Sequence, residues 1–302
     1  MKGYIQQMRK KTSAKITYAD VWEFWKKHRG MEQYVDFITV HILPYWEDHP
    51  VAIEHAVEHT SAVMTELKTV FSKPILIGET GWPSMGRQRF ESKPSLVNQA
   101  KYVREFLGAA EKNHWQYNVI EAIDQPWKRN LEGTVGGYWG IFATDLTPKF
   151  SLTSPVSEKN DGVKPMFFAI IGAALLFALA FEKNDKRKPI LFGLMALGTS
   201  AGLVAYLQWD YLATACRNLP EWLALGGVAL IGWLVIAAQP WAANPIAIHQ
   251  PARKDCNAVI QMGLVALILA SAVSSYLIFT DGRYRDFPIL LFILPAAALL
   301  IY

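Results

Sequence analysis

Glu79 is the residue whose type and setting most favour chemistry. Three β-prone aliphatic residues at positions 75–77 precede it, and Gly81 and Pro83 follow it, where no regular element can continue. The pattern predicts a short buried strand that ends in a carboxylate. Barrel enzymes place their catalytic groups at the carboxyl ends of parallel strands. A strand-end glutamate can also be a cap or a salt-bridge partner, so the pattern alone leaves both roles open.

Polar and aromatic side chains also gather at the ends of three other predicted strands, in residues 15–22, 35–42 and 117–123. Parallel strands bring these ends to one face, where rings could stack on sugars and carboxylates could bind hydroxyl groups. The candidate substrate-binding residues are Tyr18, Trp22, His41, Tyr45, Trp82, Glu121, Asp124, Trp127 and Lys128. For Trp25 and Trp115 we expect core packing instead, because aromatic rings bury large areas.

Helices are expected between these strands. Residues 4–11 suit the tail of a helix, residues 50–71 a helix with Pro50 in its first position, and Ser95 the N-cap of a helix that runs to about residue 113. Residues 22–25 are expected to form an aromatic-rich turn. Strands that alternate with helices predict parallel βαβ units, so the fold class is α/β.

The segment 78–84, Gly-Glu-Thr-Gly-Trp-Pro-Ser, resembles the nucleophile segment of glycoside hydrolase family 17, the β-1,3-glucanases and related glucanosyltransferases. The resemblance extends from about residue 4 to residue 150. It implies that Glu79 ends the seventh strand of a (β/α)8 barrel and attacks the anomeric carbon of a sugar. Residues 35–45 are similar to the sixth strand of that family, and residues 121–128 with 138–142 are similar to its eighth strand and closing segment.

On this match Lys128 takes the position of a lysine that lines the family's cleft. The chain also departs from the pattern. Gln125 stands where many members carry a second acid, and Glu132 lies at a different spacing from the closing Trp-Gly.

A retaining glycosidase needs a second carboxyl group as general acid/base, about 5–5.5 Å from the nucleophile. In the family this glutamate ends the fourth strand in an Asn-Glu pair, and no Asn-Glu dipeptide occurs in the 302 residues. Glu121, Asp124 or Glu23 could substitute, and nothing in their spacing singles one out. We therefore expect residues 1–150 to be a fragment of a bacterial, membrane-anchored type of this family, holding strands 5–8, the C-terminal half of the barrel.

The composition changes near Asp161. The chain is 52% hydrophobic, and long apolar runs dominate its second part. A polar linker at 151–164 leads into a predicted all-α transmembrane domain, 165–302, of about five helices. The expected spans are about 165–181, 190–207, 222–238, 258–279 and 288–302. No ionisable residue lies in the middle of a span, which favours an anchor or scaffold over an ion path.

Loop charges predict the orientation in the membrane. Lys183, Lys186, Arg187, Lys188, Arg253 and Lys254 flank alternate spans, and the opposite loops carry Arg217, Arg283 and Arg285. The more basic loops face the cytoplasm, so we expect a multi-pass cell-membrane protein whose glycosidase domain is exoplasmic or periplasmic. The net charge of +4 is explained by these signals, and no nucleic-acid partner is expected. Cys216 and Cys256, expected in loops on opposite faces, offer neither a disulfide nor metal-ligand spacing, so no metal or cofactor is expected.

The predicted function is retaining hydrolysis or transglycosylation of β-1,3-glucan with Glu79 as the nucleophile. Both reactions use the same carboxylates, so the acceptor stays open. The expected partners are β-glucan, the lipid bilayer and, as a further candidate, a glucan synthase. The alternative is a catalytically inactive membrane-anchored remnant, or a glucan-binding scaffold associated with glucan synthesis or export.

Overall fold

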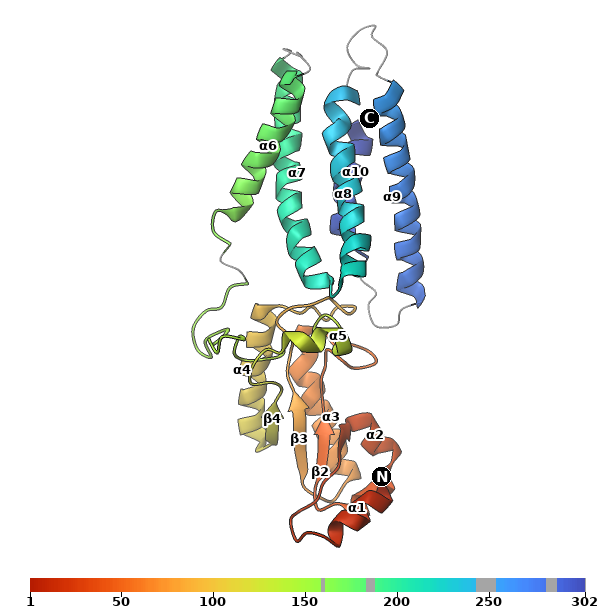
Figure 1. The fold of residues 1–302 in the computed structure, drawn as a ribbon. Helices are drawn as coiled ribbons and strands as arrows, with labels where there is room; N and C mark the ends of the chain where they lie inside the picture. Colours follow the sequence, from red (N-terminus) through yellow and green to blue (C-terminus); the bar gives the residue numbers. More distant parts are fainter. Residues whose placement is uncertain (159–160, 183–187, 243–253, 281–286, 302) are drawn as a thin grey trace. The chain divides into compact units, whose positions relative to one another are not determined.

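The computed structural model describes residues 1–158, 161–182, 188–242, 254–280 and 287–301 (Figure 1). The chain divides into two compact units, Met1–Glu158 and Lys159–Tyr302.

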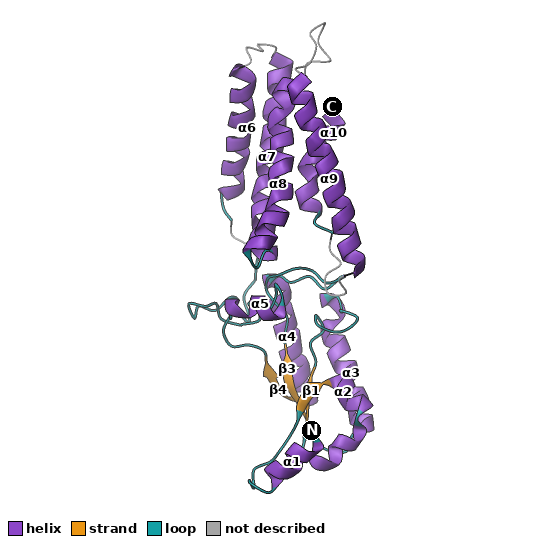
Figure 2. Cartoon of the chain, turned by 45° about the vertical axis from the view of Figure 1, so that its right-hand side comes forward, coloured by secondary structure: helices purple, strands orange, loops and turns teal. Residues whose placement is uncertain are grey.

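The first unit is built on a sheet of four parallel strands in the order β1-β2-β3-β4. Figure 2 draws the strands of this unit in orange. These strands are β1 (Ala19–Val21), β2 (Ile38–His41), β3 (Ile75–Thr80) and β4 (Gln116–Val119). The sequence-based expectation of parallel βαβ units is confirmed. Parallel pairing with helical crossovers brings the carboxyl ends of the strands to one edge of the sheet.

Three strands, β1, β2 and β4, are shorter than expected because residues beside them form hydrogen bonds outside the sheet. Ile16 exchanges backbone-directed hydrogen bonds with Asp36, since its N–H donates to Asp36 Oδ2 and its carbonyl accepts from the Asp36 N–H. After β4, the Glu121 carbonyl accepts from the N–H of Ile141, in the segment that closes the unit. Residues near Ile16 and after β4 are therefore bonded to neighbouring segments, but not as strands of the sheet.

The helices of this unit are α1 (Lys2–Arg9), α2 (Trp22–Lys27), α3 (Ala56–Val70), α4 (Leu96–Asn113) and α5 (Arg129–Glu132), with 3₁₀ turns at Arg29–Tyr34, Ile53–His55 and Pro126–Lys128. Ser95 caps α4 as expected, because its Oγ accepts from the Asn98 N–H at 3.0 Å. The helical start at Pro50 is wrong: the Val51 N–H donates to the Pro44 carbonyl, and helical structure begins at Ile53. The expected turn at residues 22–25 is the start of α2.

An aromatic core lies between the sheet and its helices, and α3 and α4 pack against each other. Trp25 is fully buried, and its indole N–H donates to the Thr39 carbonyl at 2.8 Å. Trp115 is buried beside Phe106 of α4. Core packing for these two tryptophans is therefore confirmed, and it anchors α2 and α4 to the strands that carry the site.

The second unit consists, in the described residues, of α6 (Lys164–Glu182), α7 (Lys188–Ala215), α8 (Leu219–Ala242), α9 (Lys254–Thr280) and α10 (Ile289–Ile301). Two stretches, Leu191–Ala215 and Leu219–Pro240, are long and apolar enough to cross a membrane. The apolar parts of α6 and α9, Lys164–Ala180 and Ile260–Tyr276, are shorter. Two helices could thus span a membrane, and the number of five spans stays a prediction.

Glycines let α6 and α7 approach at backbone distance. A Cβ placed at Gly172 would lie 2.1 Å from the Gly198 carbonyl oxygen, and one at Gly202 would lie 2.0 Å from the Phe168 carbonyl oxygen. Gln208 of α7 adds a polar link, since its amide donates to the Leu290 carbonyl at 3.0 Å and its oxygen accepts from Trp233 at 3.1 Å. In an apolar unit these contacts fix which helix faces meet.

Most of the charges used to predict orientation cannot be followed in the structure. Lys183, Lys186, Arg187, Arg253, Arg283 and Arg285 lie outside the described residues. Cys216 follows α7 and is buried. Cys256 belongs to α9, which corrects the expectation of a loop there.

Candidate functional site

An irregular register between β2 and β3 sets the surroundings of Glu79. The ladder pairs Ile38 with Ile75 and continues to Val40 opposite Ile77, but His41 is opposite Glu79. Gly78 is therefore one extra residue on β3, as in a β-bulge. His41 Nδ1 lies 3.1 Å from Glu79 Oε2. The bulge thus places an imidazole directly against the carboxylate at the strand end.

Glycine at position 78 makes this arrangement sterically feasible. A Cβ there would lie 2.4 Å from Thr39 Cγ2 and between 3.1 and 3.2 Å from two atoms of the His41 ring. The neighbouring strand has no room for a methyl group at this point. The glycine before Glu79 therefore permits the close approach of β2 and β3.

Glu79 is held in its ionised form. The hydrogen bond with His41 lowers the pKa of Glu79, the partial burial of the carboxyl opposes this, and the Lys128 charge lowers the pKa further. A carboxylate that attacks a sugar must be ionised, and Glu79 meets this requirement at neutral pH.

A cavity of about 360 Å³ opens beside Glu79. It is lined by Leu43, Trp46, Glu79, Ile120, Lys128, Glu132 and Trp139. The Lys128 ammonium pairs with Glu121 and lies 3.9 Å from Glu132 Oε1. Burial opposes the charge on Lys128, but the hydrogen bond with Glu121 and the charges of Glu132 and Glu79 raise its pKa. Burial raises the pKa of Glu132, so two acids of one cavity are shifted in opposite directions.

Glu121 and Asp124 face lysines. Glu121 Oε1 accepts a hydrogen bond from the Lys128 ammonium. The other oxygen, Oε2, is buried with no hydrogen-bond partner among the described residues. Asp124 Oδ1 accepts from the Gly140 N–H at 2.8 Å and from Lys149 at 2.9 Å. Burial raises the pKa of Asp124 although Lys149 opposes the shift. Both carboxylates tie the segment after β4 to its neighbours.

Tyr45 and Trp82 are fully buried, so the structure does not present either ring for stacking on a sugar. The Tyr45 hydroxyl donates to the Arg87 carbonyl at 2.7 Å, and the Trp82 indole N–H donates to the Lys93 carbonyl at 3.1 Å. Their ring centroids are 6.1 Å apart. The two side chains support the loops around the cavity from within the core, which corrects their expected position.

Trp127 is 62% exposed beside the site, 5.9 Å from the Lys128 ammonium. Trp46, which the candidate set omits, lines the Glu79 cavity. Tyr45 and Trp46 are adjacent after β2, and their rings make an edge-to-face contact with centroids 5.1 Å apart. Which of the two is buried and which lines the cavity depends on tertiary packing.

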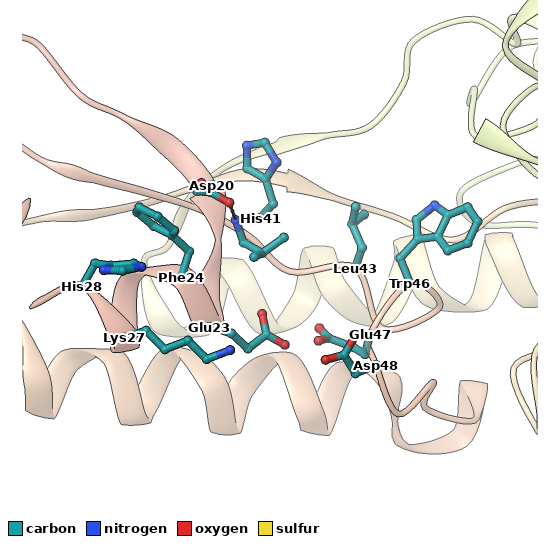
Figure 3. Close-up of a pocket in the computed structure, with 11 residues that line it drawn as sticks. Asp20, Glu23, Phe24, Lys27, His28, His41, Leu43, Trp46, Glu47 and Asp48 are labelled. Carbon is teal, nitrogen blue, oxygen red and sulfur yellow. Dashed lines mark hydrogen bonds between the residues drawn. The ribbon is translucent and has the colours of Figure 1, made fainter. Parts of the chain in front are cut away.

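A second cavity of about 330 Å³ adjoins the first and shares Leu43 and Trp46 with it (Figure 3). Its lining is mostly polar and charged: Asp20, Val21, Glu23, Phe24, Lys27, His28, His41, Leu43, Trp46, Glu47 and Asp48. Tyr18 supports this lining by donating to Asp20 Oδ2 at 2.6 Å. The structure therefore brings His41 between the two cavities, with Glu79 in one and four further carboxylates in the other.

Glu23 and Glu47 both line the second cavity. Burial and the adjoining Glu47 raise the pKa of Glu23 to about 7. Burial opposes ionisation of Glu47, but hydrogen bonds with His59, Glu23 and Trp22 lower its pKa. The Trp22 indole N–H donates to the two Glu47 oxygens at 3.1 and 3.0 Å. Trp22, a candidate substrate-binding residue, thus uses its indole N–H to bind Glu47 in this structure.

Comparisons with known proteins identify relatives of the first unit. Residues 1–140 match the family model described as the BtgE/BtgC glycoside hydrolase domain. A glucan 1,3-beta-glucosidase of Saccharomyces cerevisiae is 31% identical over 127 residues, which cover 39% of this chain and 40% of that protein. One from Arthroderma benhamiae is 28% identical and covers 50% of this chain and 54% of the relative. The chain thus spans about half or less of the length of these relatives.

Among solved structures, the glycoside hydrolase family 17 beta-1,3-glucanosyltransferase from Rhizomucor miehei is similar, with 26% identity and a TM-score of 0.45. The match covers 50% of this chain and 56% of that one. An active-site mutant of the same transferase in complex with laminaritriose gives 25% identity and a TM-score of 0.44.

Proposed function

Residues 1–140 match the BtgE/BtgC glycoside hydrolase domain, and we propose that they form a glycoside hydrolase family 17 domain in which Glu79 is the nucleophile of a retaining hydrolase or glucanosyltransferase. The observation that carries the proposal is an ionised carboxylate at the end of β3, bonded to His41 and open to a cavity. This is the charge state and position that a retaining nucleophile requires.

The proposed reaction is a double displacement. A Glu79 oxygen forms a bond to the anomeric carbon while the bond from that carbon to the leaving oxygen breaks. The departing oxygen takes a proton from a general acid, and a water or a second sugar hydroxyl then displaces Glu79. Water gives hydrolysis and a sugar gives transfer, so the same carboxylate serves both outcomes.

We assign the general acid to no residue of this chain. The Asn-Glu pair of the family is absent from the 302 residues. Glu132 lines the cavity of Glu79 and has a raised pKa, but it is close to Lys128 and belongs to the segment after β4. The chain is therefore expected to form a glycosyl-enzyme only from a donor whose leaving group departs without a proton.

β-1,3-glucan is the proposed substrate. The names of the S. cerevisiae and A. benhamiae relatives, glucan 1,3-beta-glucosidases, support this class. Trp46, Lys128 and Glu132 line the cavity of Glu79, and the exposed Trp127 lies beside Lys128. Together they offer aromatic faces and charged groups, which suit a hydroxylated ring. Glu121 and Asp124 are proposed to hold this surface in place, with His41 between the nucleophile and the adjoining cavity.

We propose further that β1–β4 correspond to the last four strands of a (β/α)8 barrel, and that the second unit is a multi-pass membrane anchor with the first unit on the exoplasmic side. The parallel order of the strands and the two apolar stretches of α7 and α8 support these assignments. A glucan synthase is the proposed protein partner. Protease added outside intact cells should cleave a tag placed before Met1; full protection of the tag would contradict this orientation.

The test uses a laminari-oligosaccharide whose anomeric carbon carries fluoride and whose neighbouring hydroxyl is replaced by fluorine, which slows release. In the full chain, Glu79 should displace fluoride and acquire one glycosyl group, detected by mass spectrometry on the peptide that contains it. The Glu79→Gln variant should acquire none. Glu58→Gln, which changes an exposed carboxylate on α3, is the matched control and should react like the parent chain.

Labelling of another residue, or equal labelling of the Glu79→Gln variant, would overturn the assignment of the nucleophile. Binding of laminari-oligosaccharide without labelling would favour the alternative function, a glucan-binding scaffold without turnover.

A further inference from the structure

Glu23 and Glu47 approach each other from two separate elements at the floor of the second cavity. Figure 3 shows the Glu23 side chain, on α2, directed toward Glu47 and Asp48, which belong to the loop after β2. Two ionised carboxylates at such a position would repel each other, whereas a neutral acid can donate a hydrogen bond to a carboxylate. The contact between Glu23 and Glu47 is therefore favourable only while one of the two carboxyl groups is protonated.

Glu47 is the fixed member of the pair. Its carboxylate accepts from the Trp22 indole of α2, and His59 Nε2 of α3 lies 3.2 Å from its Oε1. Its carbonyl accepts from the buried Arg89 at 3.3 Å. Three segments thus converge on Glu47, and Glu23 adds the contact that depends on protonation.

The loop held in this way carries Trp46. Its ring lines both cavities, including the one that contains Glu79, and lies 5.1 Å from the Arg89 guanidinium. Trp46 immediately precedes Glu47, so one peptide unit joins that ring to the residue that Glu23 contacts. A change at Glu23 can therefore reach the cleft proposed to bind glucan.

We propose that Glu23 is a positioning residue: as a neutral acid it donates a hydrogen bond to the Glu47 carboxylate, and this bond holds the Trp46 loop against α2 in the geometry that binds glucan. The inference rests on the proposed function and adds a proton requirement to it. Glu23 touches neither Glu79 nor the reacting atoms in this scheme.

Charges on every neighbouring element favour retention of that proton or compete for it. Burial and Glu47 raise the pKa of Glu23 to about 7, and the charge of Asp48 adds to the shift. The other charged or titratable groups around the pair are Asp20 of β1, Lys27 of α2, His28, His41 of β2 and His59 of α3. Because the pKa is raised, the bond is present below about pH 7 and is lost as the pH rises through that value.

The experiment compares binding of a laminari-oligosaccharide to the full chain and its variants at about pH 6 and about pH 8, on either side of the Glu23 transition. The parent chain should lose about three- to tenfold in affinity at the higher pH, the worth of one hydrogen bond. Glu23→Gln keeps a donor that does not titrate, so its affinity should stay near the low-pH value. Glu23→Ala should bind weakly at both pH values, and Glu58→Gln, with an exposed carboxylate, should behave as the parent.

A Glu23→Gln variant with the same pH dependence as the parent would overturn the inference. Thermal unfolding over the same pH range separates this failure from a failure of the proposed function. If no chain binds the oligosaccharide at either pH, the glucan assignment fails, and the inference then depends on the melting temperature alone. That temperature should fall from about pH 6 to about pH 8 more steeply in the parent than in Glu23→Gln, and equal slopes would contradict the shared proton.

Discussion

At the scale of single residues, neighbouring groups and burial shift the pKa values of the carboxyl groups of the site in opposite directions. His41 and Lys128 lower the pKa of Glu79, and burial raises the pKa of Glu132 in the same cavity. Pairs of acids whose pKa values are pushed apart are typical of sites where one group stays charged and the other keeps a proton. Glu79 has the setting of the charged member.

His41→Ala should therefore change the pH at which Glu79 reacts. The His41 bond lowers the Glu79 pKa, so the reactive anion persists to lower pH in the parent chain and is lost only as the pH falls through the lowered value. Without the imidazole, labelling by the glycosyl fluoride should fail at a higher pH and slow by about tenfold at mildly acid pH. His55→Ala, at an exposed histidine, is the control, and coincident pH profiles for all three chains would contradict the role.

Glu32 should stabilise the first unit by binding the turn before β3. Its Oε1 accepts from the N–H of Ser72 at 2.7 Å and from that of Lys73 at 2.9 Å. Burial opposes ionisation, but these bonds lower the pKa of Glu32, so its stabilisation is present above the unfolded value and is lost as the pH falls through the folded one. Glu32→Ala should cost about 1 kcal/mol at neutral pH, as a lost cap does.

Denaturant unfolding of the two chains measures this cost. The difference between parent and Glu32→Ala should shrink toward zero as the solution is acidified below the Glu32 transition. A cost that stays constant with pH would show that the side chain acts through packing instead of charge.

At the scale of elements, local patterns located the strands and the α4 cap but not every boundary. The aliphatic run before Glu79 and the hydroxyl of Ser95 act through adjacent residues, so their roles can be inferred from the sequence. The carbonyl of Pro44, by contrast, accepts a hydrogen bond from the Val51 N–H across a loop, and no local sequence preference predicts that bond. The same holds for the register shift at Gly78, which exists only once β2 lies beside β3.

Gly78→Ala tests that register. The added methyl group would meet Thr39 Cγ2 at 2.4 Å and crowd His41, so the strands must separate. We expect a loss of about 1–3 kcal/mol in the free energy of unfolding, typical of overpacking, together with slower labelling of Glu79. Gly108→Ala is the matched control inside α4, where an added Cβ meets nothing within 4 Å, and it should stabilise by about 0.4–1 kcal/mol.

Unfolding by denaturant and the labelling rate are measured on the same samples. An unchanged stability and rate for Gly78→Ala would show that β2 and β3 accommodate the methyl group without moving His41.

At the scale of the whole molecule, amino-acid composition distinguishes the two units, whereas tertiary packing determines which side chains are buried. The change near Asp161 is visible in the sequence because apolar runs replace mixed segments there, and the compact units meet at residues 158 and 159. The burial of Tyr45 and Trp82 was not predictable in this way, since a strand-end aromatic can turn toward core or surface. Tyr45 fills the core beside Trp139, whereas the adjacent Trp46 lines both cavities.

The second unit should depend on glycine at the α6–α7 contact. A Cβ at Gly198 would lie 2.3 Å from the Gly172 carbonyl oxygen, and backbone atoms cannot turn aside as a flexible side chain can. Gly198→Val should therefore force the two helices apart and lower the stability of this unit by about 1–3 kcal/mol. Gly193→Val lies on the same helix, where an added Cβ meets nothing within 4 Å, and carries the same loss of glycine and gain of a branched side chain. The two variants are compared by unfolding in detergent, with the loss of helix monitored by circular dichroism, so that the effect of the contact is separated from that of helix propensity. Equal unfolding midpoints would mean that α6 and α7 do not rely on backbone contact at Gly198.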